Sequence, residues 1–291
     1  MIGKKLDFNV LKLLISYIIF GSVGIFVGFI PLPSSVIASF RGITGGLLIL
    51  LFLAAGKKKI SRDEIKLNAR PLILSGVAIG FNWIFLFEAY RFTSIATATL
   101  CYYMAPVFVI IAAPIFLKEK IATKNIFCVL AALLGMFFIS NAALGSEKDI
   151  IGILFGLSAA LLYAVAIICN KKMGEIAAET RAMTQLLIAG VTVLPYAAFT
   201  AELGGMTLGI GAVAALLIVG VVHTGFAYVL NLGSVARVKA DTVAVLSYTD
   251  PIVAILLESI IDMTLPAKEV IIGALLILGA TAVSSINLKK N

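Results

Sequence analysis

Ten long apolar runs dominate this sequence and restrict what the chain can fold into. A membrane-spanning helix needs about 20 mostly apolar residues, and runs of that kind recur along all 291 residues. They are continuously apolar and do not alternate with polar residues, so they predict helices and not the strands of a membrane barrel. We expect spans at approximately 9–30, 34–55, 71–91, 95–117, 124–142, 150–170, 181–200, 209–233, 240–261 and 267–288.

The composition supports this prediction. Of the residues, 61% are apolar and 13% are charged, whereas soluble domains average about 45–50% and about 25%. A soluble protein of this length would have too few charges to cover its apolar surface. We therefore predict an all-α polytopic membrane protein of ten transmembrane helices, in contact with the lipid bilayer. The first run is too long for a signal peptide and is expected to be an uncleaved span.

Basic residues indicate the orientation of the spans. If both termini face the cytoplasm, 19 of the 23 lysines and arginines fall on the cytoplasmic side. Three fall on the outer side and Arg41 falls inside a span. Because cytoplasmic loops are enriched in basic residues, we predict a multi-pass protein of the cell (cytoplasmic or inner) membrane with both termini cytoplasmic. The +8 net charge is then a topology signal next to anionic lipid, and no nucleic-acid partner is expected.

A pair of similar stretches relates the two halves of the chain. Tyr103 and Pro106 in "LCYYMAPVFV" recur 145 residues later as Tyr248 and Pro251 in "VLSYTDPIVA". Each half holds five predicted spans, and an odd number gives the halves opposite orientations. We therefore predict two inverted five-helix repeats, 1–145 and 146–291, with the substrate site near the midplane between them.

The two prolines are expected to kink spans four and nine. A proline inside a helix frees the carbonyl four residues earlier, which belongs to Tyr102 for Pro106 and to Ser247 for Pro251. A free carbonyl is costly in lipid, so the kinks are predicted to border a transport path. Two kinked packing helices are the alternative.

Charged residues inside a span are functional candidates, because each costs at least about 2.5–3.5 kcal/mol on insertion scales. Asp250 precedes Pro251, and its counterpart in the first half is Ala105, so the carboxylate breaks the symmetry where a substrate would bind. Glu258 shares a broad helix face with Asp250. Both are candidates for binding a substrate, a cation or a proton. Structural pairing with Arg41 or with backbone donors is the alternative.

Three further groups have two interpretations each. Arg41 is predicted either to hold a substrate carboxylate or to neutralise Glu88 or Glu258. Glu88, near the outer end of span three, either takes part in coupling or reaches water. His223, the only histidine, suits proton coupling or serves as a hydrogen-bonded packing residue.

Aromatic residues at the same depth complete the predicted substrate site. Trp83, Tyr102, Tyr103 and Tyr248, with the hydroxyl of Ser247, are expected to line it. Such rings can bind an aromatic or cationic substrate by stacking and cation–π contacts.

The sequence lacks the patterns of several other classes. Its three cysteines lie inside apolar runs with no metal-ligand spacing, and it has no Walker-type phosphate loop, so we expect no cofactor and no ATP-driven pumping. A membrane-integral lipid-processing enzyme is the competing class, but no catalytic constellation is present. We predict that the chain is not an enzyme.

The stretch 80–140, "GFNWIFLFEAYRFTSIATATLCYYMAPVFV…", resembles the repeat signature of the drug/metabolite transporter superfamily, in its ten-helix EamA-domain branch. The matching features are the mid-helix Pro106 and, thirteen residues on, Glu119. The stretch 220–279 is similar around Pro251 but has Thr264 at the position of the glutamate. Arg41 also matches an arginine that is often found in the family's second span.

The resemblance implies alternating access by two inverted repeats around a central cavity, with Glu119 as a conformational or capping residue. Family members move amino acids, aromatic compounds, amines, choline and other metabolites. We therefore predict a secondary transporter, acting as a monomer or homodimer, for a small metabolite. The expected substrate is an amino acid or a related amphipathic compound, moved alone or with protons. An organic cation transporter of the choline type is the alternative.

Overall fold

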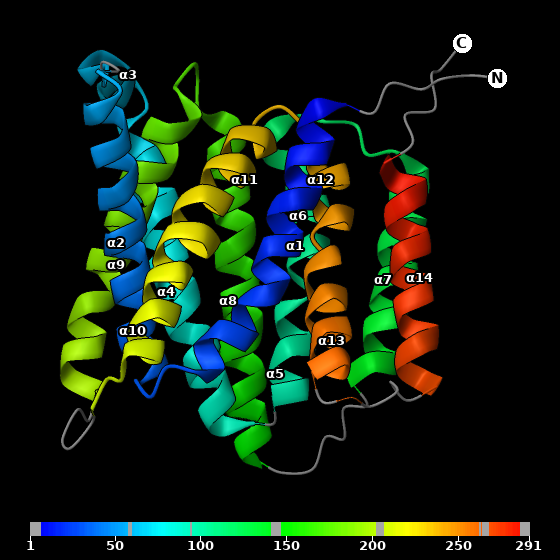
Figure 1. The fold of residues 1–291 in the computed structure, drawn as a ribbon. Coiled ribbons are helices and arrows are strands. Elements are labelled where there is room, and N and C mark those ends of the chain that lie inside the picture. The colour runs from blue at the N-terminus through cyan, green and yellow to red at the C-terminus, as the bar shows by residue number, and fades with distance from the viewer. Residues whose placement is uncertain are drawn as a thin grey trace.

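The computed structural model describes residues 7–57, 60–93, 95–140, 147–201, 207–261, 263 and 268–285. Every regular element in these ranges is helical, and the helices form one bundle (Figure 1). In these ranges, six apolar stretches are long enough to cross a membrane: α1 (Phe8–Gly28), α2 (Ser34–Ala55), α4 (Ala69–Phe92), Ile150–Lys172 of α8 (Glu147–Lys172), α9 (Ala178–Thr200) and Ile210–Val235, which comprises α10 (Ile210–Ile218), η1 (Val219–Phe226) and α11 (Ala227–Val235). The chain is therefore built as a polytopic membrane protein.

The remaining helices are shorter. They are α3 (Arg62–Leu67), α5 (Ile95–Tyr102), α6 (Ala105–Leu117), α7 (Thr123–Ser140), α12 (Ala240–Leu246), α13 (Thr249–Ile261) and α14 (Lys268–Ser285). Helices occupy all the predicted apolar runs, with ends that agree within a few residues. That the shorter ones also cross the membrane stays a prediction.

Two predicted spans are broken, and here the expectation of a kinked continuous helix is wrong. A two-residue turn separates α5 from α6, and another separates α12 from α13. Pro106 and Pro251 lie in the first turn of the second helix of each pair, where a missing N–H leaves no helical hydrogen bond unmade. The carbonyl of Ser247, expected to be free, accepts the N–H of Asp250 at 3.3 Å.

Glycines bring the long helices into close contact. A Cβ atom added to Gly42 of α2 would lie 2.9 Å from the Cα of Gly190 in α9, and one added to Gly80 of α4 would lie 2.6 Å from the Cβ of Thr192. No side chain fits there, so the backbones of α2 and α4 pack directly on α9. These contacts fix the wall in which Arg41 and Trp83 lie.

Equivalent helices of the two halves have equivalent packing partners in the opposite half. Helix α1 packs on α11 and α13, while α8, its counterpart, packs on α4 and α6. Helix α2 packs on α9, and α7 packs on α14. In Figure 1, α1 begins and α14 ends at the upper end of the bundle, whereas α8 begins at the lower end.

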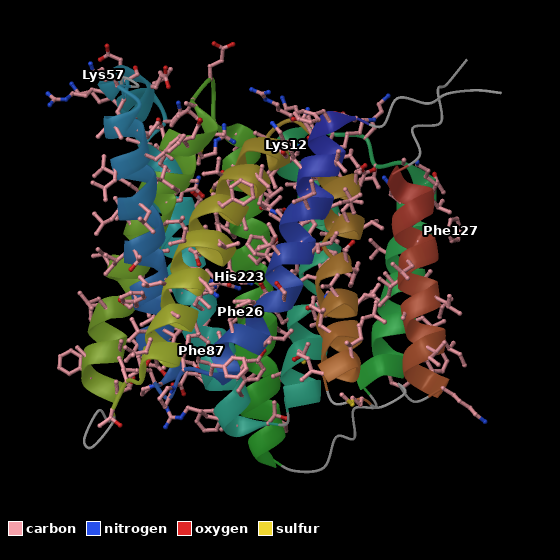
Figure 2. All side chains as sticks on the ribbon, viewed as in Figure 1. Lys12, Phe26, Lys57, Phe87, Phe127 and His223 are labelled. Atoms are coloured by element: carbon pink, nitrogen blue, oxygen red, sulfur yellow. The ribbon has the colours of Figure 1, made fainter. Side chains whose placement is uncertain are left out.

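Charge is distributed unevenly along the bundle axis. Figure 2 shows Lys12 and Lys57 at the end where α1 begins and α2 ends, which we call the basic end. Three further basic residues lie at this end: Lys118 just after α6, Lys171 in the last turn of α8 and Arg181 in the first turn of α9. At the opposite end, which we call the far end, α1 ends and α2 begins.

Candidate functional site

A cavity of about 390 Å³ extends from the far end into the middle of the bundle. Near the far end it is lined by Val27, Ser34 and Tyr90, which lie where α1 ends, α2 begins and α4 ends. Its innermost residues include Tyr17 and Tyr163, from the middle of α1 and α8. Both halves of the chain therefore contribute walls to a single chamber.

Two opposite charges line this cavity without neutralising each other. The guanidinium carbon of Arg41 lies 4.3 Å from the centre of the Trp83 ring, and its Nε is buried without a hydrogen-bond partner. Asp250 lies in the first turn of α13, where the helix dipole favours a negative group. Within the described residues neither charge takes part in an ion pair. The pairing of Arg41 with Asp250 or Glu88 is therefore not formed in this conformation.

Packed aromatic rings form the inner limit of the cavity. The ring centroids of Phe20 and Tyr228 are 5.1 Å apart, those of Trp83 and Tyr228 are 6.4 Å apart, and those of Tyr102 and Tyr163 are 6.0 Å apart. We call these five residues the aromatic floor. The chamber therefore ends at the floor instead of passing through the bundle.

A second, much smaller cavity lies on the other side of the aromatic floor. Its volume is about 40 Å³, and its polar lining comes from Asn82, Asn170 and Asn231. A cavity needs about 10–15 Å³ of this kind of space to hold one water molecule, so there is room for only a few. The Nδ2 atoms of Asn82 and Asn231 donate to the carbonyl of Ala159 at 2.7 Å and to the hydroxyl of Ser16 at 3.0 Å, which fixes both amides.

The two helix breaks meet in a hydrogen bond between the halves. The hydroxyl of Tyr248 donates to the backbone oxygen of Tyr103 at 3.0 Å. No backbone N–H reaches that oxygen, because Pro106 has none and the N–H of Val107 donates to Met104. Tyr248 is 0% exposed and is not among the residues that line the cavity. Its hydroxyl therefore stabilises the helix break at Tyr103. Tyr103 itself lines the cavity. The expectation that Tyr248 contacts substrate does not fit this position.

His223 lines the same cavity from the π-helical segment η1. Its Nε2 lies 3.0 Å from the hydroxyl oxygen of Ser22, and its Nδ1 lies 3.4 Å from the carbonyl oxygen of Ile218. Its ring packs against Phe26, with centroids 4.8 Å apart; Figure 2 shows the two side by side. The histidine is therefore both hydrogen-bonded packing and part of the cavity wall, which keeps both interpretations open.

The structure separates the other predicted residues into two groups. Tyr102, Ser247 and Pro106 line the cavity. Pro251 is buried next to the cavity-lining Asp250, without lining the cavity itself.

Glu88 lies outside the cavity lining, near the far end of α4. Its carboxylate is 2.8 Å from Nη1 of Arg91 and also accepts the hydroxyl hydrogen of Tyr196. It is thus paired locally with Arg91 and Tyr196, partners that neither alternative, contact with water or pairing with Arg41, had named. The side chain of Glu258 lies outside the described residues, so its predicted role stays a prediction.

Some cavity residues escaped prediction. Tyr17, Phe20 and Asn82 line the chamber or its floor. The available signal was weak: a polar or aromatic residue in the middle of an apolar run, without an indication of which way it faces.

Comparison with known proteins agrees with this architecture. The model of the "EamA-like transporter family" matches residues 8–141 and again 150–286, once in each half. A Bacillus subtilis (strain 168) protein named "Uncharacterized transporter YxxF" is 26% identical over 286 residues, which is 97% of this chain and 91% of that protein. An "Uncharacterized transporter" of Clostridium kluyveri is 28% identical over 265 residues, covering 84% of this chain and 82% of the relative.

A solved structure shares the fold. Its chain superposes with a TM-score of 0.84 at 18% identity, covering 97% of this chain and 99% of that one. The family is one of transporters, and these relatives are named as transporters, so the protein is not an enzyme. With both halves matched by its model, the chain belongs to the EamA-like transporter family.

Proposed function

We propose that this protein is a secondary transporter that moves a small zwitterionic metabolite, an amino acid or a related amphipathic compound. One observation carries the proposal: Arg41 and Asp250 line one cavity, and neither forms an ion pair with a described residue. A substrate carboxylate would bind the guanidinium, and a substrate ammonium would bind the carboxylate. Each half-buried charge then gains the opposite charge that it lacks in the empty cavity.

The rings around these charges suit the rest of such a molecule. Trp83 stacks on Arg41, and Tyr102 and Tyr103 lie edge to face with centroids 5.7 Å apart. Apolar walls with a few fixed polar groups are typical of small-molecule sites. A volume of about 390 Å³ falls within the range of roughly 300–1,000 Å³ known for ligand pockets.

Alternating access by two inverted repeats, 1–145 and 146–291, is the mechanism we propose. The opposite directions of α1 and α8 and the exchange of packing partners between the halves support it. We place the protein in the cell membrane with both termini on the cytoplasmic side, because the basic end carries most of the positive charge. The cavity then faces outward in this conformation.

Proton coupling is part of the proposal. Asp250 is the preferred proton acceptor, because it is an unpaired carboxylate beside the substrate position. The charged or titratable groups that share its cavity are Arg41, His223 and six tyrosines: Tyr17, Tyr90, Tyr102, Tyr103, Tyr163 and Tyr228. Protonation of Asp250 would remove the partner of the substrate ammonium and so favour release.

An organic cation transporter of the choline type is the second candidate. A carboxylate among tyrosines is suited to bind a quaternary ammonium. However, of the three carboxylates that made this alternative attractive, Glu88 is paired outside the cavity. One described carboxylate thus faces one arginine, which favours a zwitterion.

A matched ligand series tests the proposal. Purified protein is melted with an amino acid, with the amine left after removal of its carboxyl group, and with the acid left after removal of its amino group. A ligand that binds the folded state raises its stability, and the amino acid should raise it most. Flux into proteoliposomes then checks movement. Equal stabilisation by the amine supports the cation transporter, and no flux of any amino acid or amine contradicts both candidates.

A further inference from the structure

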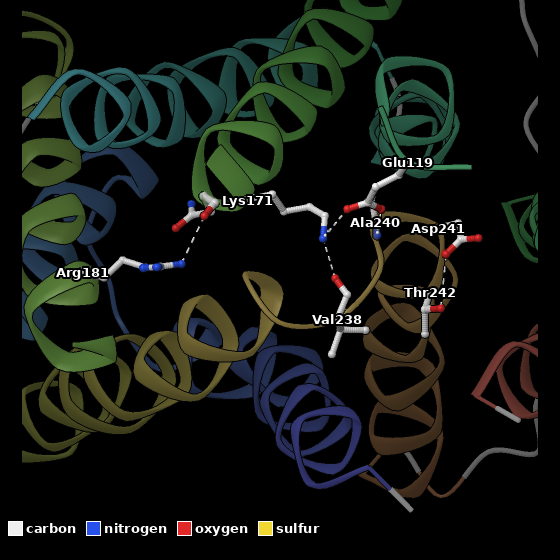
Figure 3. A network of polar contacts seen from close by, with 8 residues as sticks. Glu119, Lys171, Arg181, Val238, Ala240, Asp241 and Thr242 are labelled. Atoms are coloured by element: carbon white, nitrogen blue, oxygen red, sulfur yellow. Dashed lines mark hydrogen bonds and ion pairs between the residues drawn. The ribbon is translucent and has the colours of Figure 1, made fainter. Parts of the chain in front are cut away.

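A partly buried ionic network joins several helices at the basic end of the bundle, opposite the cavity mouth (Figure 3). Nζ of Lys171, at the end of α8, is 2.9 Å from Oε1 of Glu119 and donates to the carbonyl oxygen of Val238 at 2.6 Å. The lysine side chain is 6% exposed. Oε2 of Glu119 accepts the N–H of Ala240 at 3.0 Å. One carboxylate thus connects α8, the segment after α6 and the start of α12.

A second carboxylate makes the reverse connection. Asp241, in the first turn of α12, is 3% exposed, and its Oδ2 accepts the N–H of Ala122 just before α7 at 3.1 Å. Glu119 therefore caps the start of a helix in the second half, and Asp241 caps the segment that starts a helix in the first. A carboxylate at a helix N-terminus satisfies free N–H groups and the helix dipole. Both caps exist only while the halves touch at this end.

The network lies close in the chain to the lining of the small cavity. The small cavity beyond the aromatic floor is lined by Asn170 of α8 and Val235 of α11. The next residue of α8 is Lys171, and the chain after Val235 leads to Val238, the lysine's other partner. A solute that had crossed the aromatic floor would therefore meet this network on the way to the basic end.

We propose that the pair Lys171–Glu119, with the two caps, is the inner gate of the transporter, which opens when these contacts break. The proposal rests on the alternating-access function proposed above. Contacts that are made in only one of two conformations shift the equilibrium toward that conformation. The intact network therefore stabilises the outward-facing state, and its loss should populate the inward-facing state.

Thiol labelling in detergent tests the gate without any substrate. The three native cysteines, Cys101, Cys128 and Cys169, are replaced by alanine. One reporter, Val235→Cys, lies in the small cavity, where the native side chain is 1% exposed. A second, Ser34→Cys, lies near the far end of the large cavity. A charged thiol reagent then reports which end is accessible.

Lys171→Met should raise the labelling rate of the inner reporter at least about tenfold and lower that of the outer reporter. Lys172→Met is the matched control, because Lys172 is the neighbouring lysine and lies over the ring of Phe116, 5.2 Å from its centre, instead of contacting Glu119. It should label at the parental rate. Glu119→Gln keeps an acceptor for Ala240 but loses the charge, so its effect should be intermediate.

Melting curves show which variants are folded. If Lys171→Met does not fold, the comparison of Glu119→Gln with Lys172→Met decides. Parental labelling at both reporters in a folded Lys171→Met or Glu119→Gln variant would overturn the gate. Because no transport is measured, that result would leave the proposed function standing, whereas absent flux with an intact labelling pattern would overturn the function alone.

Discussion

Loss of the hydrogen bond between the two helix breaks should lower the free energy of unfolding by an amount that can be worked out from the structure. Tyr248→Phe keeps the ring, whose centroid lies 6.1 Å from that of Tyr103, and removes only the donor to the Tyr103 oxygen. At 3.0 Å the bond is slightly longer than the usual O–H···O distance of about 2.7–2.8 Å. Because no backbone N–H replaces it, the oxygen stays unpaired, which costs about 1–3 kcal/mol. The folding equilibrium should fall by about 5- to 150-fold.

Equilibrium unfolding in mixed micelles measures this loss, and Tyr103→Phe is the matched control. It makes the same chemical change at the equivalent position of the other half, but the acceptor there is the backbone oxygen, which the substitution leaves in place. Its effect on stability should be well below that of Tyr248→Phe, and it should instead change ligand affinity, because Tyr103 lines the cavity. Equal losses from the two substitutions would refute the reasoning.

Three further predictions concern the cavity and the helix contacts. Asp250→Asn should abolish the pH dependence of uptake; an unchanged pH profile in proteoliposomes would contradict its role. Arg41→Gln should weaken binding of a carboxylate-bearing ligand by about 10- to 150-fold, the loss of one charge-assisted hydrogen bond, and should leave binding of the matching amine nearly unchanged in the same titration. Gly42→Ala should destabilise the protein by roughly 1–3 kcal/mol, because the new Cβ would meet the backbone of Gly190; Gly28→Ala, with open space around it, is the control in the same unfolding assay.

The positions of the helices were predictable from sequence, because length and hydropathy decide where a chain crosses lipid. The helix breaks were not, since a proline is equally compatible with the interior of a kinked helix and with the first turn of a new one. The missing signal was tertiary: the hydroxyl of Tyr248 supplies the donor that the break at Tyr103 needs. The short α3 could have been found, because Ser61 accepts the N–H of Glu64, a capping pattern visible in the sequence.

The sequence predicted the depth of the site residues along their helices, but not the side of each helix on which they lie. Arg41, Trp83 and Asp250 are rare residue types in the middle of apolar runs, and all three line the cavity. Helices that are apolar on every side do not reveal which side faces the bundle axis, so the sequence did not show that Tyr248 packs outside the cavity lining or that Glu88 pairs with Arg91. The contact of Lys171 with Glu119 joins distant parts of the chain, and no sequence spacing predicts such a pair.

The aromatic floor also bears on what the protein does when no substrate is bound. Because the large chamber ends at packed rings, and only a cavity of about 40 Å³ lies beyond them, a continuous file of water through the empty molecule would need these rings to separate. Protons move along such files by hopping, so the closed floor insulates the two sides of the membrane electrically. A cell can then keep many idle copies of this protein without short-circuiting its membrane potential.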